Sequence, residues 1–160
     1  MVFSANGSVL GTVTLVAGSG SSSATFLLKG KALPVGVNSV AAVYAATGRF
    51  SGSEAKVSIT VQAPPTTVSV TASPYTLARS SSTKLAAIVK LSGGVATPAG
   101  QVTFFLGGKL LGKTNLDNTG GASLTLQGTA LSIGANTVTV SYVPSGDLVA
   151  SSTKLQLTVR

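Results

Sequence analysis

The chain has 160 residues, of which 44% are hydrophobic and only 5% aromatic, so a core must rest mainly on aliphatic side chains. It has no Cys and no His, which excludes disulfides, thiolate nucleophiles, Ser-His-Asp or Cys-His catalysis, and His- or Cys-based zinc sites. Eleven Lys and Arg against three acids give a net charge of +8, which favours weak attraction to anionic surfaces; without a basic run, it does not indicate specific nucleic-acid binding.

Short segments that alternate apolar and polar residues run through the first part of the chain. A period of two with one apolar face predicts half-buried antiparallel strands. The start resembles the middle of a strand and lacks the pattern of a signal peptide, so we expect a piece of a longer protein. No apolar run approaches the roughly 18 residues of a membrane helix, so no membrane span is expected. The residues predicted to share inward faces are Ala24, Phe26 and Leu28, then Val40, Ala42 and Tyr44, then Val57, Ile59 and Val61.

A Pro-rich linker is predicted at residues 63–66, because two adjacent prolines stiffen the chain and end strand pairing. The linker separates residues 1–62 from residues 67–160. We expect two tandem modules, the first of them incomplete.

The second part opens with two predicted strands, at residues 67–72 and 83–91, and continues with further alternating segments. Gly107-Gly108 after a strand predicts a hairpin turn. No segment has helical periodicity. The predicted inward residues include Leu85, Ala87 and Val89, Val102, Phe104 and Leu106, Ala122, Leu124 and Leu126, Val138, Val140 and Tyr142, and Leu155, Leu157 and Val159.

The two parts are copies of one repeat. Residues 3–15 match residues 104–116, and residues 33–40 match residues 131–138. The first copy carries about three extra residues in the Gly/Ser-rich stretch at 17–22. It has no counterpart of the two opening strands of the second copy. Both copies continue to a Tyr and then a Gly, at Tyr44 and Gly48 and at Tyr142 and Gly146.

This repeat resembles the bacterial Ig-like repeat family, over nearly all of the second copy and partially over the first. The family occurs in tandem on large secreted or surface-attached bacterial proteins, as stalks, spacers and adhesive modules, and sometimes beside carbohydrate-active enzymes. The resemblance implies an all-β, immunoglobulin-like antiparallel β-sandwich and an extracellular or cell-surface location. Arg49 departs from the pattern, since it stands where the second copy has Asp147. The motif residues are Gly100-Gln101-Val102-Thr103-Phe104, Leu111-Gly112, Leu131, Gly134, Val138, Tyr142 and Gly146-Asp147.

Few residues suggest chemistry. Tyr44 and Tyr142 are interpreted as buried rings with hydroxyls bonded to backbone, in the manner of a tyrosine corner, in preference to ligand-stacking aromatics. Asp117 and Asp147 are interpreted as turn residues, because a single carboxylate makes no calcium site. We predict no metal site, no cofactor and no catalytic residue.

Four exposed aromatic or basic residues form the predicted binding set. Phe105 is expected to point outward between two inward residues, near the two lysines. An anionic polysaccharide or another cell-surface polymer is the expected ligand class, with packing against a neighbouring module as the alternative. The set is Phe105, Lys109, Lys113 and Tyr75.

The missing opening strands lead to the main functional hypothesis. A sandwich without them leaves part of the other sheet's inner face bare, and an exposed apolar face with open strand edges demands a partner. We therefore predict self-association, as a homodimer or by strand exchange, through Phe3, Phe26 and Leu28, with Val40 and Ile59 on the same face.

Three function classes follow in order of preference. The first is a non-catalytic structural or adhesive module. The second is a carbohydrate-binding accessory module of a secreted enzyme. The third is a small unconventional hydrolase, built for example on Ser80–Ser82 with Lys84 or on two carboxylates.

Overall fold

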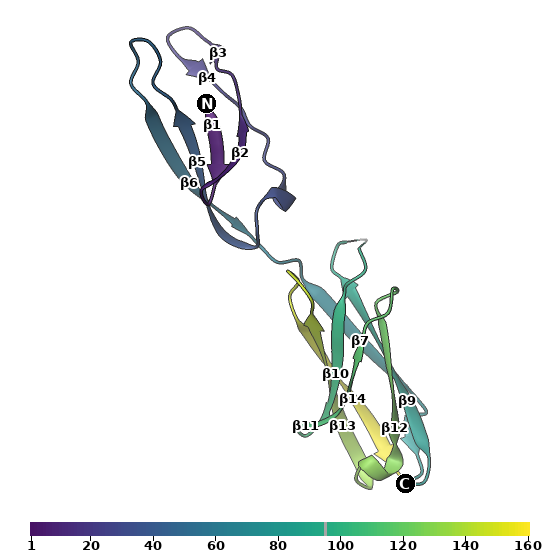
Figure 1. The fold of residues 1–160 in the computed structure, drawn as a ribbon. Helices are drawn as coiled ribbons and strands as arrows, with labels where there is room; N and C mark the ends of the chain where they lie inside the picture. The colour runs from purple at the N-terminus through teal and green to yellow at the C-terminus, as the bar shows by residue number, and fades with distance from the viewer. Residues whose placement is uncertain (95) are drawn as a thin grey trace. The chain divides into compact units, whose positions relative to one another are not determined.

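The computed structural model describes residues 1–94 and 96–160, and most of its regular structure is β-strand (Figure 1). The chain divides into two compact units, Met1–Ala63 and Pro64–Arg160, which we call the N-terminal unit and the C-terminal unit. The helices of the described residues are two 3-10 turns, η1 (Gly30–Ala32) and η2 (Gly128–Ala130). Neither has the length or the apolar composition to cross a membrane.

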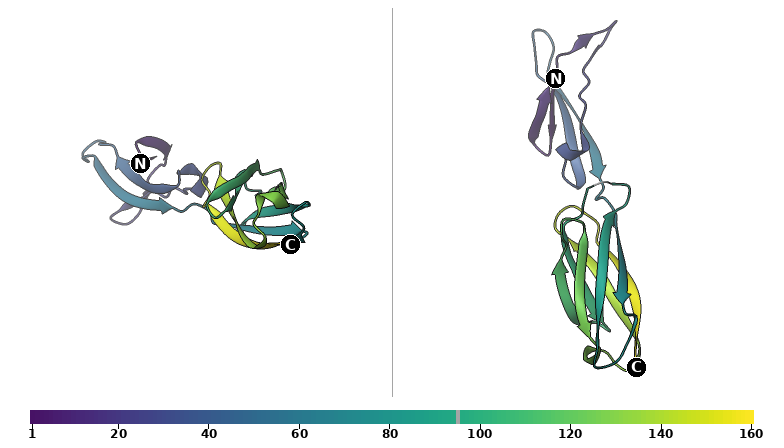
Figure 2. Two further views of the ribbon diagram at one scale, coloured as in Figure 1. Left: turned by 90° about the horizontal axis from the view of Figure 1, so that it is seen from below. Right: turned by 90° about the vertical axis from the view of Figure 1, so that its right-hand side faces the viewer.

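The C-terminal unit is an antiparallel sandwich of two layers (Figures 1 and 2). Its strands are β7 (Thr66–Ser73), β8 (Thr76–Leu77), β9 (Ser82–Leu91), β10 (Gly100–Leu106), β11 (Lys109–Asn115), β12 (Gly121–Gln127), β13 (Gly134–Pro144) and β14 (Ser151–Val159). One layer has the order β12-β9-β7, and the other β11-β10-β13-β14, where β8 adds to β14 in parallel. β7 begins at the last residue of the predicted linker, because Thr66 pairs with Leu91 on β9; its hydroxyl also donates to the Val149 carbonyl at 2.7 Å.

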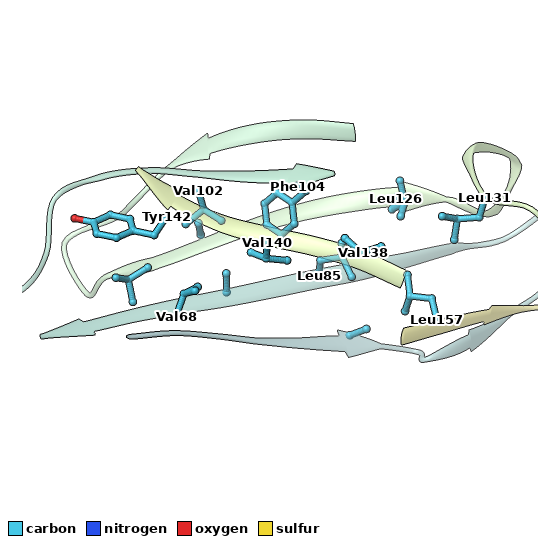
Figure 3. Packing of buried hydrophobic residues seen from close by; sticks show 14 of the residues in the cluster. Val68, Leu85, Val102, Phe104, Leu126, Leu131, Val138, Val140, Tyr142 and Leu157 are labelled. Atoms are coloured by element: carbon cyan, nitrogen blue, oxygen red, sulfur yellow. The ribbon is translucent and has the colours of Figure 1, made fainter. Parts of the chain in front are cut away.

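The alternation read from the sequence creates the core of this unit. Phe104, Val138 and Val140 are 0% exposed, and the residues that alternate with them along β10 and β13 face outward. Leu85, Ala87 and Val89 reach the core from the opposite layer. Figure 3 shows Leu85 meeting Phe104, Val138 and Val140 between the two sheets. The all-β, Ig-like sandwich expected from the sequence is therefore present.

Turns of the C-terminal unit follow local chemistry. Gly107 and Gly108 have φ angles of 54° and 87°, which form the predicted tight hairpin between β10 and β11. Asp117 caps the turn before β12, where its Oδ1 accepts hydrogen bonds from the Thr119 and Gly121 amides at 2.8 and 2.9 Å. A hydrogen bond from the Thr119 hydroxyl, together with these two amide bonds, holds the pKa of Asp117 below its usual range.

The N-terminal unit repeats one layer of this sandwich. Its strands are β1 (Val2–Ala5), β2 (Ser8–Thr12), β3 (Val16–Ala17), β4 (Ser22–Ser23), β5 (Gly36–Tyr44) and β6 (Ser53–Val61). The sheet order β2-β1-β5-β6 matches β11-β10-β13-β14 in the other unit. The three extra residues of the first copy fall in a separate hairpin, β3–β4.

Residues 24–28 differ from the sequence expectation. Their side chains alternate as predicted, with Ala24, Phe26 and Leu28 half-buried and Thr25 and Leu27 exposed. They nevertheless form no strand, and no backbone hydrogen bond joins them to any described part of the chain. The physical reason is pairing: the equivalent strand β12 forms its ladder with β9, and the N-terminal unit has no equivalent of β9.

Candidate binding site

The N-terminal unit has an uncovered apolar surface, which we call the open face: the inward side of β5 and β6, formed by Val40, Ala42, Tyr44, Val57 and Ile59. Val57 is 58% exposed and the other four are half-buried. In the C-terminal unit, the counterparts of Tyr44 and Ile59 are both 1% exposed. The difference arises because β7 packs over β13 and β14, whereas nothing in the N-terminal unit takes its place.

The two units also differ in their buried apolar residues. The cluster of buried apolar residues consists entirely of C-terminal residues. Among the described residues, the buried apolar side chains of the N-terminal unit are Ala5, Leu33 and Ala41, which are mostly small. The N-terminal unit is thus a sheet whose inner side is covered only in part, by the segment around Phe26.

One end of the open face is hollowed. A cavity of about 390 Å³ lies between β1, β5 and the β3–β4 hairpin, and it is lined by Met1, Leu15, Ser22, Ala24, Tyr44, Phe50 and Ser53. In the C-terminal unit, the equivalent Tyr142 is 1% exposed, and its hydroxyl donates to the Ala99 carbonyl at 2.6 Å. This confirms the predicted backbone-bonded tyrosine for Tyr142. The Tyr44 hydroxyl makes no such bond within residues 1–94 and 96–160.

The segment 24–28 is already seated on the sheet, although it lacks a strand partner. Its anchor is the Phe26 ring, which stacks on Phe3 with centroids 5.3 Å apart. A Cβ added to Gly11 would lie 2.6 Å from Phe26 Cε2, and one added to Gly112 would lie 2.8 Å from Leu124 Cδ1. Both units therefore use a glycine on the sheet as the seat for an inward side chain of the covering strand.

An asparagine fixes the loop at one end of the open face. Asn38 is 1% exposed, and its amide group donates to the Pro34 and Gly36 carbonyls at 2.9 and 3.0 Å. Asn6 donates to Asn38 Oδ1 at 2.8 Å. Asn136 makes the corresponding bonds to the Ser132 and Gly134 carbonyls. Sequence reasoning assigned no role to these residues; their recurrence in both copies was the available signal.

The residues predicted for self-association fall into two groups. Phe3 and Phe26 cover one another, so they contribute less free surface than the sequence suggested. Leu28 lies next to them and is half-buried. The uncovered surface extends instead over β5 and β6, where Val57 is 58% exposed.

The residues predicted for ligand binding do not form one site. Phe105 and Lys113 lie on adjacent strands, where their cross-strand partners are Leu110 and Thr103. Lys109 pairs with the inward Leu106 at the hairpin end. Tyr75 is 48% exposed beside β8, across the sheet from β11.

Polar chemistry is sparse in the described residues. They contain no cluster of three acids that could hold a metal ion, and their one ion pair is Lys56 with Glu54, 3.2 Å apart on the surface. Asp147 is exposed at a turn. No hydrogen bond in this part of the chain joins Lys84 to Ser80–Ser82, which are all exposed.

The chain matches a known family of bacterial domains. Residues 69–160, more than half of the chain, match the family model described as bacterial Ig-like domain (group 3). Among curated proteins, none matches the chain.

Three solved structures are similar. A bacterial immunoglobulin-like domain from the M. primoryensis ice-binding adhesin is 20% identical, over 62% of this chain and 100% of that one, with a TM-score of 0.42. A Ca²⁺-stabilized adhesin that helps an Antarctic bacterium bind ice is 18% identical, over 78% of this chain and 32% of that one, with a TM-score of 0.46. Yersinia pseudotuberculosis adhesin InvE is 14% identical, over 98% and 48%, with a TM-score of 0.45.

Proposed function

Because the chain belongs to the bacterial Ig-like domain family (group 3), we propose that it is a non-catalytic structural or adhesive module of a large extracellular or cell-surface bacterial protein. The open face of the N-terminal unit is the observation that carries this proposal. A sheet with an uncovered apolar side is suited to contact with another polypeptide. The described residues offer no cleft of convergent catalytic groups that would favour an enzyme.

We further propose that the chain self-associates, with a second copy covering the open face. Four strands about 4.8 Å apart and up to nine residues long give a sheet face on the order of 500 Å². Covering half of it is worth about 6 kcal/mol at about 25 cal/mol per Å². That amount is comparable with the whole stability of a small domain, so association competes well with leaving the face in water.

Sedimentation velocity over a wide concentration range tests this proposal. The wild-type mass should rise with concentration, and Val57→Lys should keep the chain monomeric because it places a charge on the open face. Val37→Lys is the matched control: Val37 is 73% exposed on β5 but points to the other side, so this variant should associate like the wild type. A wild-type chain that stays strictly monomeric at high concentration would contradict self-association.

A second candidate function is binding of an anionic or neutral polysaccharide by the C-terminal unit. Phe105 and Leu110 are cross-strand partners, and Lys113 lies one residue pair away from the bulge at Phe104/Phe105. An aromatic ring and a lysine on the same face of a strand pair form a platform of the kind that stacks against sugars. Affinity electrophoresis in gels that contain polysaccharide should show retardation that Phe105→Ala abolishes. Equal mobility of both proteins in every gel would remove this candidate.

A further inference from the structure

We infer that the open face is an acceptor site for an antiparallel strand pair with the pattern of residues 66–91, which residues 1–63 do not themselves supply. This inference rests on the open face of the proposed function. It differs in the occupant: a pair of strands takes the place of a second sheet packed face to face. The C-terminal unit is the template, because it shows the same sheet with that occupant in place.

The template specifies the occupant. In the C-terminal unit, β9 pairs with β12 in antiparallel register from Gly121↔Ile88 to Gln127↔Ser82. β7 then pairs with β9 and packs on β14. The strand pair presents aliphatic side chains at every second position and polar ones between them. Its inward residues are Leu85, Ala87 and Val89 on β9 and Val68, Val70 and Ala72 on β7.

In the N-terminal unit, residues 24–28 already lie where the acceptor edge would form, although they are not yet a strand. Residues 24–28 correspond to β12 and keep its alternation of inward and outward side chains. Phe26 sits on Gly11 as Leu124 sits on Gly112, so the segment lies where the first donor strand would pair. The Ser123 carbonyl accepts from Thr114 on β11, so its neighbours Ala122 and Leu124 direct their backbone groups to β9. In a strand with the same alternation, Ala24, Phe26 and Leu28 would direct theirs to the open edge.

The side chains beneath the missing strands are also those of a buried layer. Val40, Ala42, Tyr44, Val57 and Ile59 are all apolar or aromatic, although solvent reaches each of them. Ala42 stands where the C-terminal unit has Val140, and Phe26 where it has Leu124. The acceptor therefore differs in shape from the template, and its preferred donor has a larger residue over Ala42 and a smaller one beside Phe26.

The mode of recognition is strand addition to an open edge. Backbone hydrogen bonds supply affinity, and the alternate side chains that fill the uncovered layer supply specificity. Because the asparagine-fixed loop and the seated segment 24–28 exist without a donor, the acceptor is preorganised and little ordering opposes binding.

The test uses the full chain and a synthetic peptide of residues 64–94 as the probe. Isothermal titration should give saturable one-to-one binding. Amide NMR shifts of the labelled chain should change in residues 1–63 and not in residues 64–160. A control peptide with Leu85→Asp and Val89→Asp should bind at least tenfold more weakly. In the chain, Val57→Lys should weaken binding and Val37→Lys should not.

The outcomes separate this inference from self-association. A peptide that binds and converts associated chains into one-to-one complexes supports both. Peptide binding to a chain that is monomeric throughout supports the acceptor and refutes self-association. The acceptor is refuted if the chain associates but the peptide neither binds nor dissociates it. Shift changes confined to residues 64–160, or equal binding of the control peptide, also refute it.

Discussion

Tyr142→Phe removes one hydroxyl from the closed sandwich and leaves the ring in place. The lost bond is the 2.6 Å contact with the Ala99 carbonyl. That carbonyl keeps the Ser145 amide as a donor at 3.1 Å, so it is not left without a partner. The expected cost is therefore the net value of one hydrogen bond, about 1 kcal/mol of the free energy of unfolding. For a unit of this size, that corresponds to a drop in Tm of roughly 4–8 °C.

Tyr44→Phe is the matched control at the equivalent position of the N-terminal unit. The Tyr44 hydroxyl has no such bond among the described residues, so the free energy of unfolding should change by less than about 0.5 kcal/mol. Calorimetry and urea unfolding followed by circular dichroism measure both variants. Equal losses in the two, or no loss in Tyr142→Phe, would refute the reasoning.

Tyr142 also predicts a dependence on alkaline pH. Burial raises the pKa of its hydroxyl above the ordinary value of 10.0, so the folded state holds this proton more tightly than the unfolded state. The resulting stability is complete below pH 10 and is lost as the pH rises above it. This loss should be smaller in Tyr142→Phe. An identical alkaline profile in the variant would contradict the assignment.

Three further predictions concern the repeat. Phe104→Ala should cost about 3–5 kcal/mol of the free energy of unfolding, because Phe104 is 0% exposed. Phe3→Ala lies on a half-covered face and should cost clearly less in the same urea titration. Equal costs would mean that the N-terminal face is filled. Gly112→Ala should cost about 1–3 kcal/mol of the free energy of unfolding, because its Cβ would displace Leu124. Calorimetry should show this cost as a lower Tm. An unchanged Tm would mean that Leu124 moves aside without loss of stability. Asp117→Ala should lower Tm at neutral pH. The difference in Tm between wild type and variant should narrow as the pH falls below 3.8, because the stabilising form is the carboxylate with its lowered pKa. A difference in Tm that does not vary with pH would argue against the cap.

Much of the C-terminal unit could be predicted from the sequence because its signals are local. Alternation assigned Val102, Phe104, Val138 and Val140 to the core, and each is 0% exposed. The glycine pair at the β10–β11 turn carried its own conformational requirement. The carbonyl that pairs with Tyr142 could not be predicted, since Ala99 is 43 residues away and meets the hydroxyl only in the folded sandwich.

Prediction was less successful in the N-terminal unit, because a strand there depends on a neighbouring strand that is distant in sequence. Alternation correctly oriented Ala24, Phe26 and Leu28, but a strand also needs a neighbour for its backbone groups. The stacking of Phe26 on Phe3 was missed as well, because sequence matching placed both on an apolar face without saying that they meet. The open face consequently lies further toward β6 than the sequence suggested.

The parallel pairing of β8 with β14 has a mechanical consequence. The first residues of β7 and the last residues of β14 lie at opposite ends of the C-terminal unit (Figure 1). Tension between those ends would run along the strands and load the Thr158↔Thr76 and Val159↔Leu77 pairs in shear. The bond from the Arg160 amide to the Leu77 carbonyl, 3.0 Å long, would be loaded with them. Bonds loaded in shear share the force and break together, whereas bonds that are peeled open break one at a time. Under tension between its ends, the unit would therefore resist until these bonds break together.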